Sequence, residues 1–186
     1  GMGHNELLIR EALAGRRRED VFIAVKFGAQ RGPDRGFLGL DNRPAAVKTA
    51  LAYTLERLGT DYVDLYQPAR VDPAVPIEDT VGAIKDMIDA GHVRYIGLSE
   101  AGADTLRRAH AVHPIAWLQI EYSLMARGIE KEILPAARSL SVSISAYGVL
   151  SRGLLSGHWS KAMDLAASDF RGHLPRFTGG NLDRNL

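Results

Sequence analysis

Short apolar runs alternate along the chain with longer segments in which apolar residues recur every three or four positions. Five of the apolar runs are bounded by loop residues and are predicted to be β-strands: residues 21–26, 62–66, 93–98, 117–121 and 142–147. They carry few polar side chains and little alternation, which is typical of strands covered on both faces of a parallel sheet. Trp117 starts one of them and is expected to pack in the core.

The segments between the strands have helical periodicity. Helices are predicted over residues 5–13, 44–58, 77–90, 103–112 and 130–140. Asp41 and Asn42 precede the second of these as capping residues, and Gly91 follows the third as a C-cap. The tail, residues 157–186, is polar and loop-like, with a weak helical start near Asn181.

Strands that alternate with crossover helices form a parallel sheet with right-handed connections. Two α/β architectures fit: a doubly wound open sheet, or part of an eight-stranded βα barrel. No GxGxxG follows any strand and no GxxxxGK[ST] occurs, so the phosphate-binding turns of the Rossmann and P-loop folds are missing. The glycine-rich residues 28–40 resemble an elaborated βα loop, of the kind that builds the mouth of a barrel.

Chain length limits the barrel. A complete barrel takes about 250 residues, whereas this chain has 186. Residues 1–186 are therefore expected to form a single domain, an incomplete barrel whose sheet has two open edges.

Composition narrows the function classes. The net charge is +1, from 23 basic and 22 acidic residues, which argues against nucleic acid or a membrane surface as the partner. No stretch reaches the ~18 apolar residues of a membrane span. The chain has no cysteine, which excludes disulfides and thiol chemistry and suits a reducing compartment such as the cytoplasm. The six histidines show no metal-ligand spacing, so no metal site is expected.

Polar residues stand at the C-terminal end of every predicted strand, where parallel α/β folds place their ligands. They are Lys26, Gln67, Arg70, Ser99, Glu100, Gln119, Glu121 and Tyr147. Taken alone, Lys26 has two interpretations: a strand end whose ammonium reaches water, or a group that reaches into a site. The agreement among five strand ends favours a site.

Five blocks in this order resemble the aldo-keto reductases: "VFIAVKFG", "LERLGTDYVDLY", "VDPAVPIEDTVGAIKDMIDAGHVRYIGLSE", "LQIEYSL" and "AYGVLSRGLLSG". The resemblance extends from Asn5 to about Gly157. Members of that family are βα barrels that reduce aldehydes and ketones with NADPH, which lies extended across the C-terminal face. The resemblance therefore implies an incomplete (β/α)8 TIM barrel of about five parallel strands with crossover helices, NADPH as cofactor and a small carbonyl compound as substrate.

The resemblance also implies site residues. Lys26 matches the family's catalytic lysine, whose ammonium lowers the pKa of the tyrosine that donates the proton. The implied cofactor contacts are Ser99 and Gln119 at the nicotinamide carboxamide, Tyr147 stacked on its ring, and Leu150, Ser151 and Arg152 along the pyrophosphate.

The chain departs from the family pattern at three places. Ala69 stands where the family has a histidine, and Gln67 and Arg70 are the two candidates to replace it. The family's aspartate and tyrosine would precede "GMGHNELL", and none of the six tyrosines occupies the proton-donor position. The basic segment that grips the adenosine phosphate would follow Leu186, so the resemblance assigns no preference between NADPH and NADH.

These departures predict a truncated chain with impaired or absent turnover. The alternative is a catalytically dead module derived from the same fold. Such a module would either bind the nucleotide without chemistry or form a homo-oligomer that covers the open sheet edges.

Overall fold

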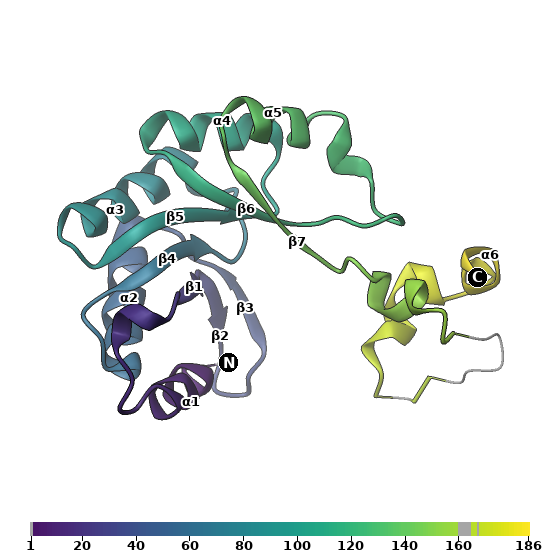
Figure 1. The fold of residues 1–186 in the computed structure, drawn as a ribbon, viewed down its shortest axis with the longest axis horizontal. Coiled ribbons are helices and arrows are strands. Elements are labelled where there is room, and N and C mark those ends of the chain that lie inside the picture. The colour runs from purple at the N-terminus through teal and green to yellow at the C-terminus, as the bar shows by residue number, and fades with distance from the viewer. Residues whose placement is uncertain (1, 160–164, 167) are drawn as a thin grey trace. The chain divides into compact units, whose positions relative to one another are not determined.

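Five strands form one sheet in the order β1-β4-β5-β6-β7. They are β1 (Ala24–Phe27), β4 (Val63–Pro68), β5 (Val93–Ser99), β6 (Ile115–Glu121) and β7 (Ser143–Tyr147). The pairs β1–β4, β4–β5 and β5–β6 run parallel. This computed structural model describes residues 2–159, 165–166 and 168–186, and it confirms the predicted five-stranded parallel α/β fold (Figure 1).

Two compact units divide the chain. The sheet unit comprises Gly1–Ile120 and Glu130–Ser145, and the tail unit comprises Glu121–Ile129 and Ala146–Leu186. Each is described by itself below. That residues 1–186 form a single domain stays a prediction.

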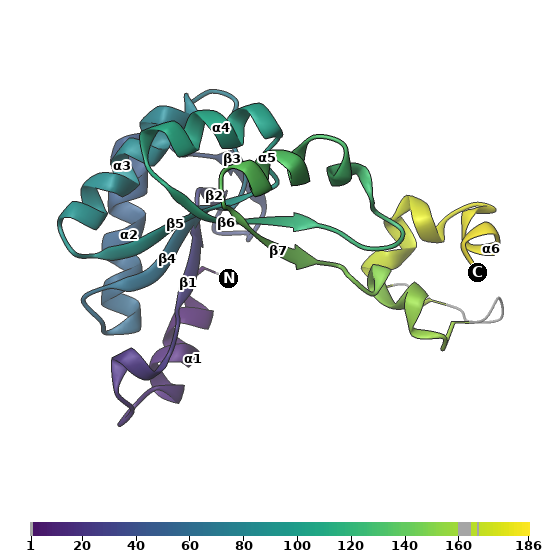
Figure 2. The same cartoon turned by 45° about the horizontal axis from the view of Figure 1, so that its top comes forward.

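Helices cover one face of the sheet. They are α1 (His4–Ala12), α2 (Pro44–Leu58), α3 (Ile77–Asp89), α4 (Ala103–Val112) and α5 (Ile133–Ser139). Figures 1 and 2 show α2, α3 and α4 side by side along that face. The core lies between these helices and the sheet, and its most deeply buried side chains include Val47, Leu51, Tyr66, Val81, Ile84, Ile96, Leu98, Leu106 and Leu118.

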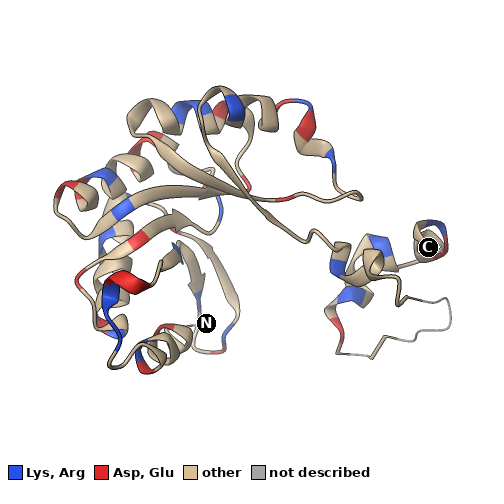
Figure 3. Cartoon of the chain, in the orientation of Figure 1, with Lys and Arg blue, Asp and Glu red and all other residues tan. Residues whose placement is uncertain are grey.

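Charge is spread over the outside of this unit. Figure 3 shows residues of both signs interspersed along the helices. No helix of the described residues is both long enough and apolar enough to cross a membrane.

The prediction that Asn42 caps α2 is wrong. The N-cap of α2 is Arg43, and Asn42 is buried in front of it. The side-chain NH₂ of Asn42 donates to the carbonyl of Arg70 at 2.8 Å, and the backbone carbonyl of Asn42 accepts from the Thr80 hydroxyl at 3.0 Å. Asn42 therefore ties the loops after β3 and β4 to α3, although its side-chain Oδ1 is buried and accepts no hydrogen bond from the described residues.

Gly28, directly after β1, is expected not to tolerate a side chain. Its φ is +92°, and an added Cβ would lie 2.2 Å from Oδ1 of Asn42. Gly28→Ala should lower the free energy of unfolding by about 2 kcal/mol, because backbone strain and a clash coincide. Urea unfolding measures this loss.

The matched control is Gly82→Ala within α3, where nothing lies within 4 Å of the added Cβ. Alanine should raise the stability there by up to about 1 kcal/mol. Equal stabilities of the Gly28 variant and the wild type would contradict the clash.

The glycine-rich residues 28–40, expected to be a loop, contain a hairpin of β2 (Ala29–Arg31) and β3 (Phe37–Leu40). The tail unit is built mainly of 3₁₀ turns, and the predicted helical start at Asn181 is confirmed as α6 (Asn181–Asn185). Among the described residues, the 3₁₀ turns are Arg18–Asp20, Gly128–Glu130, Ser151–Ser156, Phe170–His173 and Pro175–Phe177. Residues 160–164 and 167 of the predicted tail lie outside the described residues.

Candidate active site

A cavity of about 890 Å³ lies along β1, at the edge of the sheet, and extends over the face of the sheet opposite α3 and α4. Four strands contribute polar side chains to it: Lys26 from β1, Gln67 from β4, Gln119 from β6 and Ser145 from β7. Its volume lies in the range of small-molecule and cofactor sites. Parts of α1 and α2 complete the lining, through residues that include Glu6, Tyr53 and Arg57.

Strand alternation places Lys26 on this face. Successive side chains of a strand point to opposite faces, so Val25 and Phe27 turn toward the helices, where Phe27 stacks on Tyr66 with 4.3 Å between ring centroids. Lys26 turns the other way, in register with Gln67 on β4. The Glu100 carboxylate interacts electrostatically with the Lys26 ammonium.

Burial lowers the pKa of Lys26, the nearby Arg70 guanidinium lowers it further, and Glu100 opposes both. Lys26 as a whole residue is exposed, so this burial is only partial. A cation in this setting is available to stabilise negative charge on a bound molecule.

Gln67 and Gln119 form a hydrogen-bonded chain with Trp117. The Trp117 indole N–H donates to Oε1 of Gln67 at 2.6 Å, and Nε2 of Gln67 donates to Oε1 of Gln119 at 3.0 Å. Trp117 was expected in the core, but it is half-buried on the open face, where Phe22 lies 6.0 Å from it between ring centroids. The correction follows from strand parity, since Leu118, and not Trp117, faces the helices.

The absence of a side chain at Gly97 of β5 makes this series of hydrogen bonds possible. Trp117 and Gln67 stand on the strands at either side of β5, with Gly97 between them and in register with Trp117. An added Cβ at Gly97 would lie 2.5 Å from Oε1 of Gln67 and 2.7 Å from Nε1 of Trp117. The side chains meet across β5 because that position carries none.

Ser99 is fully buried at the end of β5, in register with Gln119. Its hydroxyl accepts from Nη1 of Arg70 at 3.3 Å, and the same nitrogen donates to the carbonyl of Ala69 at 2.7 Å. The two candidates to replace the histidine thus differ. Both amide atoms of Gln67 are engaged by protein groups, whereas Arg70 is exposed and has donors to spare.

The tail unit holds the other residues implied by the resemblance. Ser151 is buried, with its hydroxyl 3.0 Å from that of Ser123, while Leu150 is exposed. The Arg152 guanidinium carbon lies 5.7 Å from the ring centroids of both Tyr147 and Phe170. The structure therefore gathers Tyr147, Ser151 and Arg152 into one neighbourhood of this unit.

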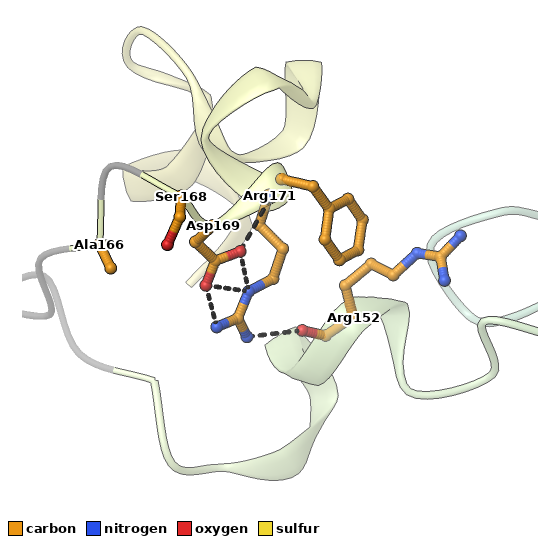
Figure 4. A pocket seen from close by; sticks show the side chains of 6 residues that line it. Arg152, Ala166, Ser168, Asp169 and Arg171 are labelled. Carbon is orange, nitrogen blue, oxygen red and sulfur yellow. Dashed lines mark hydrogen bonds and ion pairs between the residues drawn. The ribbon is translucent and has the colours of Figure 1, made fainter. Parts of the chain in front are cut away.

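A cavity of about 520 Å³ lies beside Arg152 (Figure 4). The ion pair of Asp169 and Arg171, with 2.6 Å between its charged atoms, forms one wall, and Arg171 also donates to the carbonyl of Arg152 at 3.3 Å. The Arg171 guanidinium and the backbone N–H of that residue hold the pKa of Asp169 below its usual range. Arg171 is thereby neutralised by its neighbour, so Arg152 is the better placed of the two cations to meet an anion.

Reasoning from the sequence missed Trp117 and the role of Gln67 beside it. Strand-end polarity marked Gln67, but only the cross-strand register shows that it links Trp117 to Gln119. The described residues contain no group of three or more His, Cys, Asp or Glu side chains arranged to hold a metal ion.

Comparisons with known proteins identify the relatives of this chain. A family model described as "Aldo/keto reductase family" matches residues 1–172. The chain is 46% identical over its full length to a probable aldo-keto reductase 1 of Glycine max and 47% identical over 91% of its length to the aldo-keto reductase str7 of Strobilurus tenacellus. It spans 53% and 50% of these two relatives, about half their length.

Solved structures give the same result. A glycerol dehydrogenase from Gluconobacter oxydans is 29% identical, with a TM-score of 0.90 over 99% of this chain and 57% of that one. An aldo-keto reductase from Bacillus halodurans, in its holo form, is 30% identical, with a TM-score of 0.75 over 90% of this chain and 54% of that one. The five parallel strands thus correspond to part of a TIM barrel, and the chain belongs to the aldo/keto reductase family.

Proposed function

We propose that this protein takes part in reducing an aldehyde or ketone by hydride transfer from NADPH. One observation carries the proposal: the Lys26 ammonium, partly desolvated, stands on the same cavity as Gln119. When hydride adds to a carbonyl carbon, negative charge develops on the oxygen. A fixed cation beside that oxygen stabilises the transition state more than the substrate.

The residues present suit the nicotinamide end of the cofactor. Gln119 and Ser99, neighbours in register, offer an amide and a hydroxyl to a carboxamide. In the tail unit, Tyr147 offers a ring for stacking and Arg152 a charge for phosphate. NADPH would supply the hydride when bound, while Gln119 and Ser99 would orient its nicotinamide and Lys26 would stabilise the charge that forms.

None of the residues assigned to the site donates the proton that the reduction of a carbonyl requires. By the family pattern no tyrosine of the chain stands at the donor position. Tyr66 cannot serve, because it is fully buried and its hydroxyl donates to the carbonyl of Val47 on the helix side at 3.1 Å. General-acid catalysis contributes about 10²–10⁴-fold, so we expect the 186-residue chain to bind NADPH and to turn over slowly or not at all.

The competing function is a nucleotide-binding or structural module without chemistry. Ala69 favours it, since alanine can neither orient a carbonyl nor carry a proton, and so does the full engagement of Gln67 by protein groups. In either case we expect the ligand to be a small molecule, and the cysteine-free composition suggests the cytoplasm.

Two assays on the 186-residue chain separate these functions. NADPH binding is followed by fluorescence titration, and NADPH oxidation is measured with a panel of aldehydes and ketones. Lys26→Met, which keeps the length of the side chain but not its charge, should lower any turnover and leave NADPH bound. Lys48→Met is the matched control, because Lys48 pairs with Asp86 on the surface at 2.7 Å.

Saturable binding with turnover that depends on Lys26 supports the reductase. Binding without turnover supports the nucleotide-binding module. If NADPH does not bind at all, both are overturned, and an oligomer seen by sedimentation would then point to the structural module.

A further inference from the structure

The chain of hydrogen bonds through Trp117, Gln67 and Gln119 has a direction. An indole N–H can only donate, so the 2.6 Å contact requires that Gln67 present its carbonyl oxygen to Trp117. The Gln67 amide nitrogen must then face Gln119. Because that nitrogen is a donor as well, Gln119 has to present its own oxygen to it, at 3.0 Å.

The remaining nitrogen of Gln119 is consequently the group left for a ligand. The opposite orientation of Gln119 would set two N–H donors against each other inside the site, where an unsatisfied polar group is costly. Gln67 is 2% exposed, so water does not readily relieve such a mismatch.

Ser99, like Gln119, keeps a hydrogen-bond donor for a ligand. Its oxygen accepts from Arg70, and its own proton remains to be donated. Two neighbours in register, on β5 and β6, can thus each offer a donor. A ligand group with an acceptor oxygen suits this pair.

We propose that Trp117 and Gln67 are positioning residues that fix Gln119 as a hydrogen-bond donor to the carboxamide oxygen of the nicotinamide. This inference rests on the proposed function for the identity of the ligand. The hydrogen bonds that run from Trp117 through Gln67 to Gln119 are called the relay below. The direction of the relay rests only on these three side chains. Neither Trp117 nor Gln67 needs to touch the cofactor.

Gln67→Glu tests the direction, because a carboxylate only accepts hydrogen bonds. It would still accept from Trp117, but its second oxygen would require the Gln119 amide to turn round. Gln119 would then offer its oxygen, which pairs with the NH₂ of a carboxamide rotated to meet it. The 3-acetylpyridine analogue of NADP keeps the carbonyl oxygen and has a methyl group in place of that NH₂, so it could not make this bond.

Calorimetric titration at pH 8 gives the dissociation constants of NADP and of the acetylpyridine analogue, and the wild-type ratio of the two is the baseline. In Gln67→Glu the analogue should weaken about tenfold more than NADP, as expected when a polar group loses its partner. Gln67→Met, which removes the relay without reversing it, should weaken both ligands alike. Gln30→Glu adds the same charge to the same cavity away from the relay, and it should leave the ratio at baseline.

A general structural effect would weaken both ligands equally in Gln67→Glu, and that result overturns the inference. If the wild type binds neither nucleotide, the proposed function fails instead. The relay is then judged without a ligand, from hydrogen exchange of the Trp117 indole N–H by NMR. Slow exchange that becomes fast in Gln67→Met supports the relay, and fast exchange in the wild type overturns it.

Discussion

Asp64→Asn is expected to lower the free energy of unfolding by about 3 kcal/mol, since losing the charge of a buried ion pair leaves its partners uncompensated. Asp64 lies on β4, and its side chain is 3% exposed. Its Oδ2 accepts from the N–H of Ile23 at 2.8 Å and from Arg18 at 2.7 Å, and its Oδ1 accepts from Arg94 at 3.0 Å. An amide in its place sets an NH₂ group against an arginine.

Both arginines depend on Asp64 for their placement. Their guanidinium carbons each lie 4.1 Å from the ring centroid of Tyr62, where cation–π attraction adds to the ion pairs. Urea unfolding at pH 7 measures the loss. Asp86→Asn, which breaks an exposed pair with Lys48, is the control and should change stability by less than about 1 kcal/mol. A similar small loss for both variants would refute the prediction.

The effect of Asp64 should also depend on pH. Burial raises the pKa of Asp64, but the Ile23 N–H and the Arg18 and Arg94 guanidinium groups outweigh it and hold the pKa below its ordinary value of 3.8. A carboxyl whose folded pKa is depressed stabilises the fold above its unfolded pKa and loses that contribution as the pH falls through the folded value. The difference between the wild type and Asp64→Asn should therefore shrink as the pH drops below about 4.

Gly97→Ala is expected to cost about 2 kcal/mol of stability and to break the hydrogen bond between Trp117 and Gln67, because overpacking forces its neighbours apart. The added methyl would lie under 3.0 Å from Gln67, Trp117 and Leu65. The φ of Gly97 is not positive, so the cost arises from packing and not from backbone strain.

Urea unfolding and the indole N–H resonance of Trp117 measure the two effects separately. Gly82→Ala within α3 serves as the control, since nothing lies within 4 Å of its added Cβ, and it should leave the indole resonance unchanged without lowering the stability. An unshifted indole resonance in Gly97→Ala would show that the relay can accommodate the methyl group.

The periodicity of apolar residues correctly predicted the elements whose bounds are set by their own residues. Helix α2 begins at Pro44 and ends before Gly59, which has a φ of +66°, and both residues mark helix ends by their own backbone chemistry. The hairpin of β2 and β3 was missed, because its glycines weaken strand propensity and its pairing depends on a register between two short segments.

The candidate site was predictable only in part. Strand ends marked Lys26 and Gln119, and the structure brings both to one cavity. The part played by Asn42 was missed, because its amide bonds to Arg70, 28 positions away in sequence. Trp117 was misplaced for a related reason: an apolar run looks the same whichever parity faces the helices, and only the packing of Leu118 settles it.

The two tryptophans of the chain fall in different units. Trp117 belongs to the sheet unit, and Trp159 belongs to the tail unit, where its ring lies 5.1 Å from that of Phe177. Each unit thus carries its own intrinsic fluorophore, and a variant that retains one tryptophan reports on one unit. Coincident emission changes during unfolding would identify a single cooperative transition, whereas separate midpoints would identify two.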